Sequence, residues 1–343
     1  LFDAVAFNAA FGMLPLLTRD VAIRHLEVRM DEVERSVALH GVNGFVRTLR
    51  GTAVPSCLAE LRENPSSDEV DLRFVCVAAR DASVAGSAGS CAGCSCRWED
   101  EWDLTLHTVA DAEDVAAVIV EPILGEGGYV VPPPGFLPRL RELTRERGIL
   151  LIADEIQTGM GRTGRMFAVQ HQGVEPDILV FAKGIASGLP LSGIIARRDL
   201  LATWAPGTHG GTYGGNVVAC AAALATLDVM EEERLPQNAA ERGAQFLAAL
   251  RELAKNRPAI GDVRGLGLML GLEFVTPGVG DGRVPNPEVT AKVKAEALAR
   301  KLIVLTAGTY VNVVRIIPPL NTTADEVDLA LSILDESLAA AGA

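Results

Sequence analysis

Two charged residues stand at the ends of apolar segments, and their types and spacing suggest chemistry. Asp154 follows the segment 148–153, and Lys183 follows the segment 177–182, twenty-nine residues further along the chain. Continuous apolar runs rich in isoleucine, valine and leucine are typical of strands buried on both faces of a parallel sheet. Open α/β sheets bind their ligands at the carboxyl ends of such strands. We therefore expect both side chains to lie at one edge of a sheet, in a ligand site.

An acid and a lysine at such an edge are what pyridoxal phosphate requires. The lysine forms a Schiff base with the cofactor, and the acid keeps the pyridine nitrogen protonated so that the ring accepts electrons. A lysine that ends a buried strand is difficult to explain as a solvated face, and burial would lower the pKa of Lys183, which suits a Schiff base. The alternative for Asp154 is a helix cap after the strand, which is the more common role of a lone aspartate there.

Carboxylates and an amide flank this pair. Glu121 ends the apolar run Val115–Val120, and Glu126 follows in a glycine-rich loop. Two carboxylates five residues apart could serve acid–base chemistry or pair with a cation, although a surface turn is a credible reading of Glu126 alone. Gln157 could donate a hydrogen bond to a phenolate oxygen, or simply lie in a loop.

Two later segments add an anion site and a cation. Thr212 lies in a glycine-rich stretch that opens a long helix, where a hydroxyl and free backbone N–H groups bind anions. A helix cap made by Asn216 is the alternative, and both can hold at once. Arg315 lies among the alternating apolar residues of the strand predicted at 311–317. A guanidinium in that setting needs a carboxylate partner, from a substrate or from an internal glutamate.

Composition excludes several classes of function. The net charge is −13 and no basic cluster is present, which argues against nucleic-acid partners and anionic membranes. No run of eighteen apolar residues could span a bilayer. Residues 1–17 are apolar but carry Asp3 and no basic residue, so they make a poor signal peptide. The chain begins with leucine, which suggests that its true beginning is missing. These features favour a cytoplasmic protein.

Five of the six cysteines precede residue 100, and the segment 91–96 contains a C-x-x-C. It could be a metal or redox site, or a coincidence inside a stretch rich in serine, glycine and alanine. No second C-x-x-C and no nearby histidine complete a set of four ligands, so we favour coincidence and expect no metal.

The chain changes character near residue 107. Before it, the patterns are weak: a helix over Arg24–Leu39, a strand over Leu72–Ala79 and a structureless stretch at 81–97. After it, strands and helices alternate, which predicts an α/β domain with a mostly parallel sheet, followed from about residue 260 by a smaller α+β unit. The predicted strands are 115–120, 148–153, 177–182, 192–196, 267–274, 302–305 and 311–317. The predicted helices are 135–147, 216–233, 239–255 and 287–301.

Residues from about 107 to 343 resemble the class III pyridoxal-phosphate aminotransferases, and among them most closely the 4-aminobutyrate aminotransferase group. The matching segments are 118–129, 151–167, 176–192, 209–216, 261–274 and 312–320. The resemblance implies the fold type I architecture: a partial cofactor-binding large domain at 107–258 and a small C-terminal domain at 259–343. Residues 1–106 do not match and read as an atypical region, out of frame or poorly ordered.

The resemblance also implies roles toward pyridoxal 5'-phosphate. Lys183 matches the Schiff-base lysine and proton shuttle, and Asp154 matches the partner of the pyridinium nitrogen. Gln157 matches the residue bonded to the ring hydroxyl oxygen. Thr212 matches a phosphate ligand that family homodimers donate across the subunit interface. Glu121 matches an acidic position near the cofactor.

Two further residues match the substrate site. Arg315 matches the clamp for a substrate carboxylate, and Glu126 matches the glutamate that pairs with that arginine. In the family, this pairing lets one pocket accept both an amine-end substrate and a dicarboxylate keto acid. The implied partners are therefore small amino acids and 2-oxo acids.

Two hypotheses compete on these grounds. In the first, Lys183 serves a ping-pong transfer of the amino group of an ω-amino acid such as 4-aminobutyrate to 2-oxoglutarate. In the second, the chain is an inactive, truncated or frame-disrupted relative without the cofactor, because residues 1–106 lack the family's phosphate cup and stacking aromatic residue. A third possibility keeps the cofactor but catalyses racemisation or an aminomutase reaction. Arg315 with Glu126 favours the transaminase.

Overall fold

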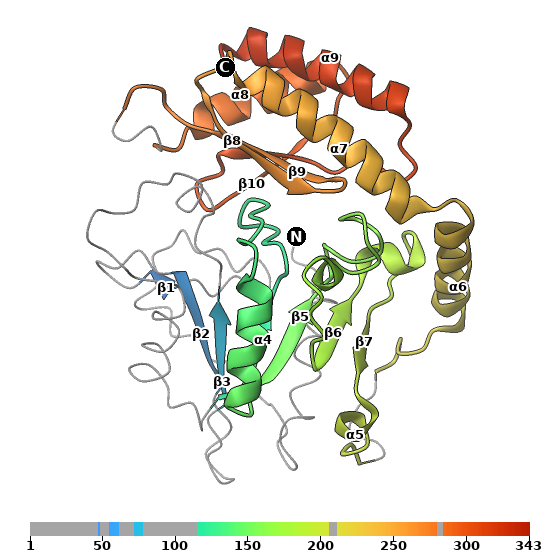
Figure 1. The fold of residues 1–343 in the computed structure, drawn as a ribbon. Coiled ribbons are helices and arrows are strands. Elements are labelled where there is room, and N and C mark those ends of the chain that lie inside the picture. Colours follow the sequence, from blue (N-terminus) through green and yellow to red (C-terminus); the bar gives the residue numbers. More distant parts are fainter. Residues whose placement is uncertain (1–46, 49–54, 62–71, 78–114, 206–210, 280–283) are drawn as a thin grey trace. The chain divides into compact units, whose positions relative to one another are not determined.

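The computed structural model describes residues 115–205, 211–279 and 284–343, together with the backbone of three strands between residues 47 and 77 (Figure 1). The helix predicted at 24–39, the stretch 81–97 and the C-x-x-C lie outside the described residues. None of the helices within the described ranges combines the length and the apolar character that a membrane crossing requires.

The chain divides into two compact units. The first contains residues 1–122, 133–156 and 172–226, and the second contains 123–132, 157–171 and 227–343. The segments that follow β4 and β5 therefore belong by their packing to the second unit. The boundaries at 106 and 258 that the resemblance implies stay a prediction.

A seven-stranded sheet forms the centre of the first unit, with its strands in chain order. The strands are β1 (Arg47–Thr48), β2 (Pro55–Leu61), β3 (Leu72–Val77), β4 (Val115–Val120), β5 (Leu150–Asp154), β6 (Ile178–Phe181) and β7 (Gly193–Ala196). The pairs β3/β4, β4/β5 and β5/β6 are parallel, and the other pairs are antiparallel. The sequence pattern predicted β3 to β7 to within a few residues.

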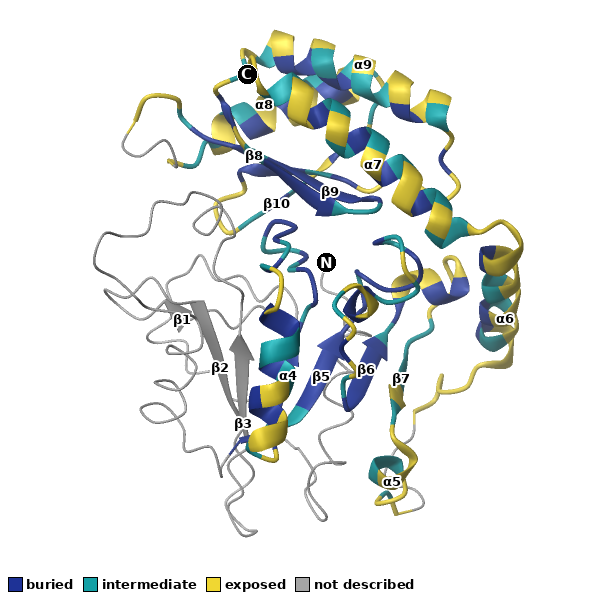
Figure 2. Cartoon of the chain, viewed as in Figure 1, coloured by how far each residue is buried: buried dark blue, intermediate teal, exposed yellow. Residues whose placement is uncertain are grey.

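The central strands are buried, as their continuous apolar runs predict. Figure 2 shows β5 and β6 buried along most of their length. One cluster joins side chains of β4, β5 and β6 and of the residues that follow β5 and β6: Ala117, Ile119, Ile152, Ile156, Ile178, Val180 and Ala182. Helix α4 (Phe136–Glu146) packs against β5 and buries Leu137, Leu140 and Leu143, the residues at helical spacing in the sequence.

Strand β7 runs antiparallel to β6, which differs from a simple continuation of the parallel sheet. The reason is the length of the connection. Residues 182–192 contain only the short 3-10 helix η5 (Lys183–Ala186), whereas a parallel return needs a crossover of a dozen or more residues. Helix α5 (Arg198–Leu201) follows β7, and α6 (Val217–Glu232) begins in the first unit and ends in the second.

The second unit has an antiparallel sheet of four strands in the order β10-β11-β9-β8, with helices α7, α8 and α9 on one face (Figure 1). Its strands are β8 (Ile260–Leu266), β9 (Met269–Phe274), β10 (Leu305–Ala307) and β11 (Val313–Ile316). Its helices are η4 (Ala168–His171), α7 (Leu235–Ala254), α8 (Pro287–Ala299) and α9 (Ala324–Ala341). The predicted strand at 302–305 lies three residues later, as β10, and the prediction missed β8 and α9.

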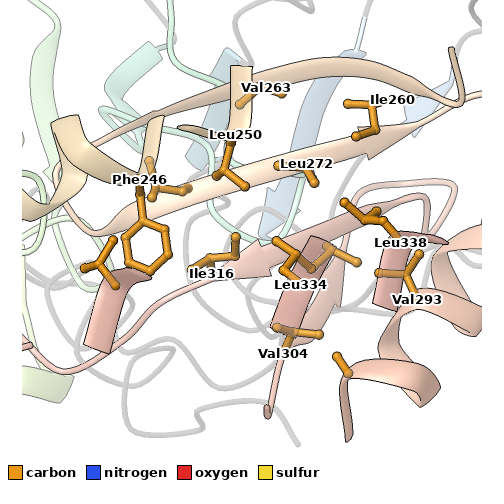
Figure 3. Packing of buried hydrophobic residues seen from close by; sticks show 14 of the residues in the cluster. Phe246, Leu250, Ile260, Val263, Leu272, Val293, Val304, Ile316, Leu334 and Leu338 are labelled. Carbon is orange, nitrogen blue, oxygen red and sulfur yellow. The ribbon is translucent and has the colours of Figure 1, made fainter. Parts of the chain in front are cut away.

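The core of the second unit lies between its sheet and these helices. Figure 3 shows Phe246 and Leu250 of α7, Val293 of α8 and Leu334 of α9 packed against the strands. Alternate residues of β9 and β11, such as Leu272 and Ile316, enter this core. The residues between them must face the opposite side of the sheet, because strand side chains alternate in direction.

Candidate active site

Three charged residues lie at the carboxyl edge of the first unit's sheet. Asp154 is the last residue of β5, and Glu121 follows β4 directly. Lys183 lies two residues after the end of β6. Because β4, β5 and β6 are parallel neighbours, all three residues meet at one edge, as the sequence predicts.

Asp154 is almost completely buried, with 6% of its surface exposed. Its Oδ1 accepts a hydrogen bond from the backbone N–H of Ile156 at 3.1 Å. No helix begins there, so the bond closes a local turn, and the predicted alternative of a helix cap is wrong. Burial raises the pKa of Asp154 to about 6, against the backbone bond and the charge of Lys183, which both lower it. A buried carboxylate in this state would gain stability from a further cation.

Lys183 is exposed, so the prediction that its ammonium is buried is wrong. The reason is local: β6 ends at Phe181, and the chain turns sharply into η5. Lys183 adopts φ 51° at this turn, in the left-handed region. For a residue with a side chain, that conformation costs about 1–2 kcal/mol. Strain at a ligand-binding edge is a common sign of a functional residue.

The second unit holds a separate polar cluster around Glu126. Arg315 lies in β11 on the face opposite the helices, between the core residues Val314 and Ile316. Its Nη1 forms an ion pair with Glu126 Oε1. Gln157 Nε2 donates to the same oxygen at 3.0 Å. The sequence left a substrate carboxylate or an internal glutamate as the partner of Arg315, and in the structure the internal glutamate Glu126 takes this place.

Arg315 keeps one donor that these contacts do not use. Its side chain is only 15% exposed. The described part of the chain gives its buried Nε no hydrogen-bond partner. A buried donor without a partner costs about 1–3 kcal/mol, so the site favours a ligand with an acceptor oxygen.

Sequence reasoning missed Tyr129, which is almost completely buried beside Arg315. The guanidinium carbon of Arg315 lies 6.0 Å from the centre of its ring. Burial raises the pKa of Tyr129 to about 12, although the charges of Arg315 and Arg162 oppose this shift. Its place directly after two glycines was the signal available in the sequence. In the structure its φ of 58° lies in the left-handed region.

Thr212 is exposed in the turn that precedes α6. Asn216 caps this helix, because its Oδ1 accepts from the backbone N–H groups of Val218 and Ala219 at 3.0 and 3.1 Å. The cap reading of Asn216 is thus confirmed. The role of Thr212 as a phosphate ligand stays a prediction.

Comparison with known proteins identifies the family. The profile described as "Aminotransferase class-III" matches residues 92–338. The chain therefore belongs to the class III aminotransferases, whose members depend on pyridoxal phosphate. The sequence motifs placed the start of the family resemblance at about residue 107. The profile match begins earlier, at residue 92. The α/β fold with its mixed sheet is consistent with fold type I, which confirms the predicted fold class.

The relatives include aminotransferases of terminal amines. The 5-aminovalerate aminotransferase of Pseudomonas putida is 46% identical over 230 residues, which are 67% of this chain and 53% of that protein. The 4-aminobutyrate aminotransferase of Escherichia coli is 43% identical over 242 residues, which are 69% of this chain and 56% of that protein. The chain thus spans about half the length of the curated relatives it matches.

A solved structure shows the same likeness. The ornithine aminotransferase of Toxoplasma gondii, in a crystal structure described as having partial occupancy of pyridoxal phosphate, has a TM-score of 0.63 and 37% identity. The alignment covers 70% of this chain and 54% of that one.

The residues at the sheet edge suit this cofactor. A buried carboxylate with a raised pKa suits a protonated ring nitrogen, which would add a second positive charge to that of Lys183 and favour the ionised form of Asp154. Lys183 offers a primary amine on a strained turn at the same edge. The chemistry of this donor set therefore fits pyridoxal phosphate.

Proposed function

We propose that the chain catalyses ping-pong transfer of the amino group of an ω-amino acid, similar to 4-aminobutyrate, to 2-oxoglutarate. The activities named for the two relatives support this substrate class. The observation that carries the proposal is the ion pair between Arg315 and Glu126, because an internally neutralised arginine with an unused donor is suited to two kinds of substrate.

Four residues would hold the cofactor. Lys183 would bind it covalently as a Schiff base, and Asp154 would pair with its ring nitrogen. Gln157 has two amide protons, of which one goes to Glu126, and the other would serve the ring hydroxyl oxygen. Thr212 would contact the phosphate of a partner subunit in a homodimer. When bound, the cofactor supplies an electron sink that makes a proton on the amine-bearing carbon acidic.

Lys183 would act as the general base and acid. Its Nζ would take up the proton from the amine-bearing carbon of the substrate and release it again in the following step, so that Lys183 serves first as base and then as acid. Lys183 is exposed on a turn, which leaves its side chain room to move between these two tasks. Asp154 would remain ionised throughout and keep the ring nitrogen protonated.

Arg315 and Glu126 would solve the two-substrate problem. An ω-amino acid has no carboxylate beside its reacting carbon, so Glu126 would stay on Arg315 and neutralise it. In 2-oxoglutarate a carboxylate adjoins the reacting carbon, and it would replace Glu126 on the guanidinium. Planar guanidinium groups bind carboxylates through two parallel hydrogen bonds, and the Nε of Arg315, which has no partner among the described residues, would provide the second donor.

Separate measurement of the two half-reactions tests this proposal. We expect Arg315→Lys to raise the KM for 2-oxoglutarate by about tenfold or more, because one bond to a charged group is lost. The KM for 4-aminobutyrate should change much less. Equal effects on both half-reactions would contradict the assigned role of Arg315. Product analysis separates the alternatives, since a racemase would convert its substrate without consuming 2-oxoglutarate.

Two supporting roles are part of the same proposal. Glu121 would adjust the charge around the cofactor from the end of β4, where it is half-buried. Formation of a homodimer would bring Thr212 to the cofactor of the partner subunit. We also propose that the enzyme is cytoplasmic. Sedimentation of the purified chain with and without pyridoxal phosphate tests the dimer.

A further inference from the structure

We propose that Arg264 and Gly271 are positioning residues that hold Glu126 on Arg315 and so set the balance between the two substrates. This inference rests on the proposed function. Arg264, Gly271 and Arg315 form one row across three strands, since Gly271 of β9 pairs with Arg264 of β8 and with Arg315 of β11. Directly paired residues point to the same face of a sheet. The loop that carries Glu126 therefore meets a row with an arginine on each side of a glycine.

Gly271 provides the space in which this loop lies. A Cβ atom at residue 271 would stand 3.3 Å from Tyr129 Cβ and 3.4 Å from the carbonyl oxygen of Gly128. Both distances are at or below ordinary contact, so a larger residue would push the loop away from the sheet. The absent side chain thus lets the loop backbone rest on β9.

Arg264 fixes the loop at the same point. Its side chain is 9% exposed, and its Nε donates to the carbonyl oxygen of Gly128 at 3.0 Å. Its Nη1 donates to Asp262 Oδ2 at 2.8 Å and also pairs with Glu273. The two carboxylates hold the guanidinium in place, so the bond to Gly128 is made from a rigid group.

Two further contacts restrain the loop backbone. The N–H of Gly308 donates to the carbonyl oxygen of Glu126 at 2.9 Å. Leu124 and Val130 exchange backbone hydrogen bonds of 3.0 and 3.2 Å across the base of the loop. The backbone of Glu126 is therefore held on both sides. Only its side chain needs to rotate when a substrate carboxylate displaces it from Arg315.

The positioning role makes a directional prediction. If Arg264 no longer holds Gly128, Glu126 will reach Arg315 less well, and the ion pair will weaken. The guanidinium of Arg315 then binds a dicarboxylate more readily, because Glu126 competes less for it. Binding of an ω-amino acid weakens, because Glu126 no longer neutralises the charge of Arg315. Binding of glutarate, an unreactive dicarboxylate, should become tighter, while the KM for 4-aminobutyrate should rise.

Arg264→Lys is the informative variant, because it retains a charge for Asp262 and Glu273 but loses the Nε bond to Gly128. We expect the ratio of the KM for 4-aminobutyrate to the Kd of glutarate to rise by roughly tenfold. Gly271→Ala tests the same loop without altering any charge, and should move the ratio in the same direction by about threefold. Calorimetric titration with glutarate and the isolated half-reaction with 4-aminobutyrate give the two values.

Arg257→Lys is the matched control. Arg257 has a largely covered side chain that pairs with Asp335 and donates to the carbonyl oxygen of Leu253, and it makes no described contact with the loop. Its replacement should leave the ratio unchanged. An unchanged ratio in folded Arg264→Lys and Gly271→Ala would overturn the inference while the proposed function stands. Glutarate binding that survives Arg315→Lys would instead overturn the proposed function, and this inference with it.

Discussion

The buried carboxylate of Asp154 makes the cofactor-free protein less stable at neutral pH, and replacing it should reveal this. Asp154→Asn keeps a side-chain oxygen that can accept from Ile156 N–H, but it carries no charge. Since burial raises the pKa of Asp154, ionisation of this group opposes folding. The variant without cofactor should therefore be more stable than the wild type near pH 7.5.

The magnitude follows from the pKa. The pKa of the Asp154 carboxyl rises from 3.8 in the unfolded chain to about 6 in the folded protein. Between these values the folded state binds more protons than the unfolded state, so stability falls as pH rises through that window. At pH values above this window, ionisation of Asp154 lowers the free energy of unfolding by its full amount. At about 1.4 kcal/mol for each pKa unit, the penalty is about 3 kcal/mol. The entropy of unfolding is about 2.1 cal/mol/K per residue, or about 0.7 kcal/mol/K for 343 residues, so this penalty corresponds to roughly 4 °C in Tm.

Thermal unfolding of cofactor-free protein between pH 4 and pH 8 measures this effect. The Tm of Asp154→Asn should exceed that of the wild type at pH 7.5, and the difference should shrink toward zero near pH 4. Saturating pyridoxal phosphate should reverse the order, since only the carboxylate pairs with a cationic ring. A wild type that is the more stable protein at pH 7.5, or a difference independent of pH, would refute this reasoning.

Asp177→Asn is a useful contrast. Asp177 is equally buried, but its carboxylate pairs with Arg141 and accepts from the N–H of Leu151 at 2.8 Å. Its replacement should destabilise the protein at pH 7.5, because it leaves the half-buried Arg141 without its charged partner.

Three other substitutions test local packing and the site. Tyr129→Phe should change the KM for 2-oxoglutarate severalfold and leave the fold intact, because it removes only the hydroxyl near Arg315; identical half-reaction kinetics would show that the hydroxyl plays no part. Thr323→Ala should cost about 1 kcal/mol in thermal unfolding, since it removes the capping box of α9, and an unchanged Tm would argue against that box. Gly243→Ala should destabilise by about 2 kcal/mol or more, as its Cβ would lie 2.1 Å from the carbonyl oxygen of Gly267; a normal Tm and full expression would contradict this contact.

Apolar periodicity was sufficient to predict much of the fold. Strands β4, β5 and β6 are buried on both faces, so their residues form unbroken apolar runs that are easy to recognise. Strand β8 was missed because it contains two glycines, Asp262 and Arg264, which are uncommon inside strands. Helix α9 was missed although Thr323 and Glu326 carry the spacing of a capping box.

The sequence predicted the positions of those site residues that lie at the carboxyl ends of buried strands. Asp154 and Glu121 lie at the edge where their strands place them. The exposure of Lys183 was not predictable, because it depends on a sharp turn directly after β6 that the apolar pattern does not record. Tyr129 and Arg264 were missed for a different reason: their partners are more than a hundred residues away in sequence, and only the sheet pairing of the second unit brings them together.

Borohydride trapping of the cofactor tests the central claim most directly. The purified chain would be incubated with pyridoxal phosphate, reduced with sodium borohydride and digested, and its lysines would be examined by mass spectrometry. We expect one stoichiometric phosphopyridoxyl group on Lys183, absent from Lys183→Arg and weaker in Asp154→Asn. No label, or label spread over other lysines with Lys183 unmodified, would contradict the account.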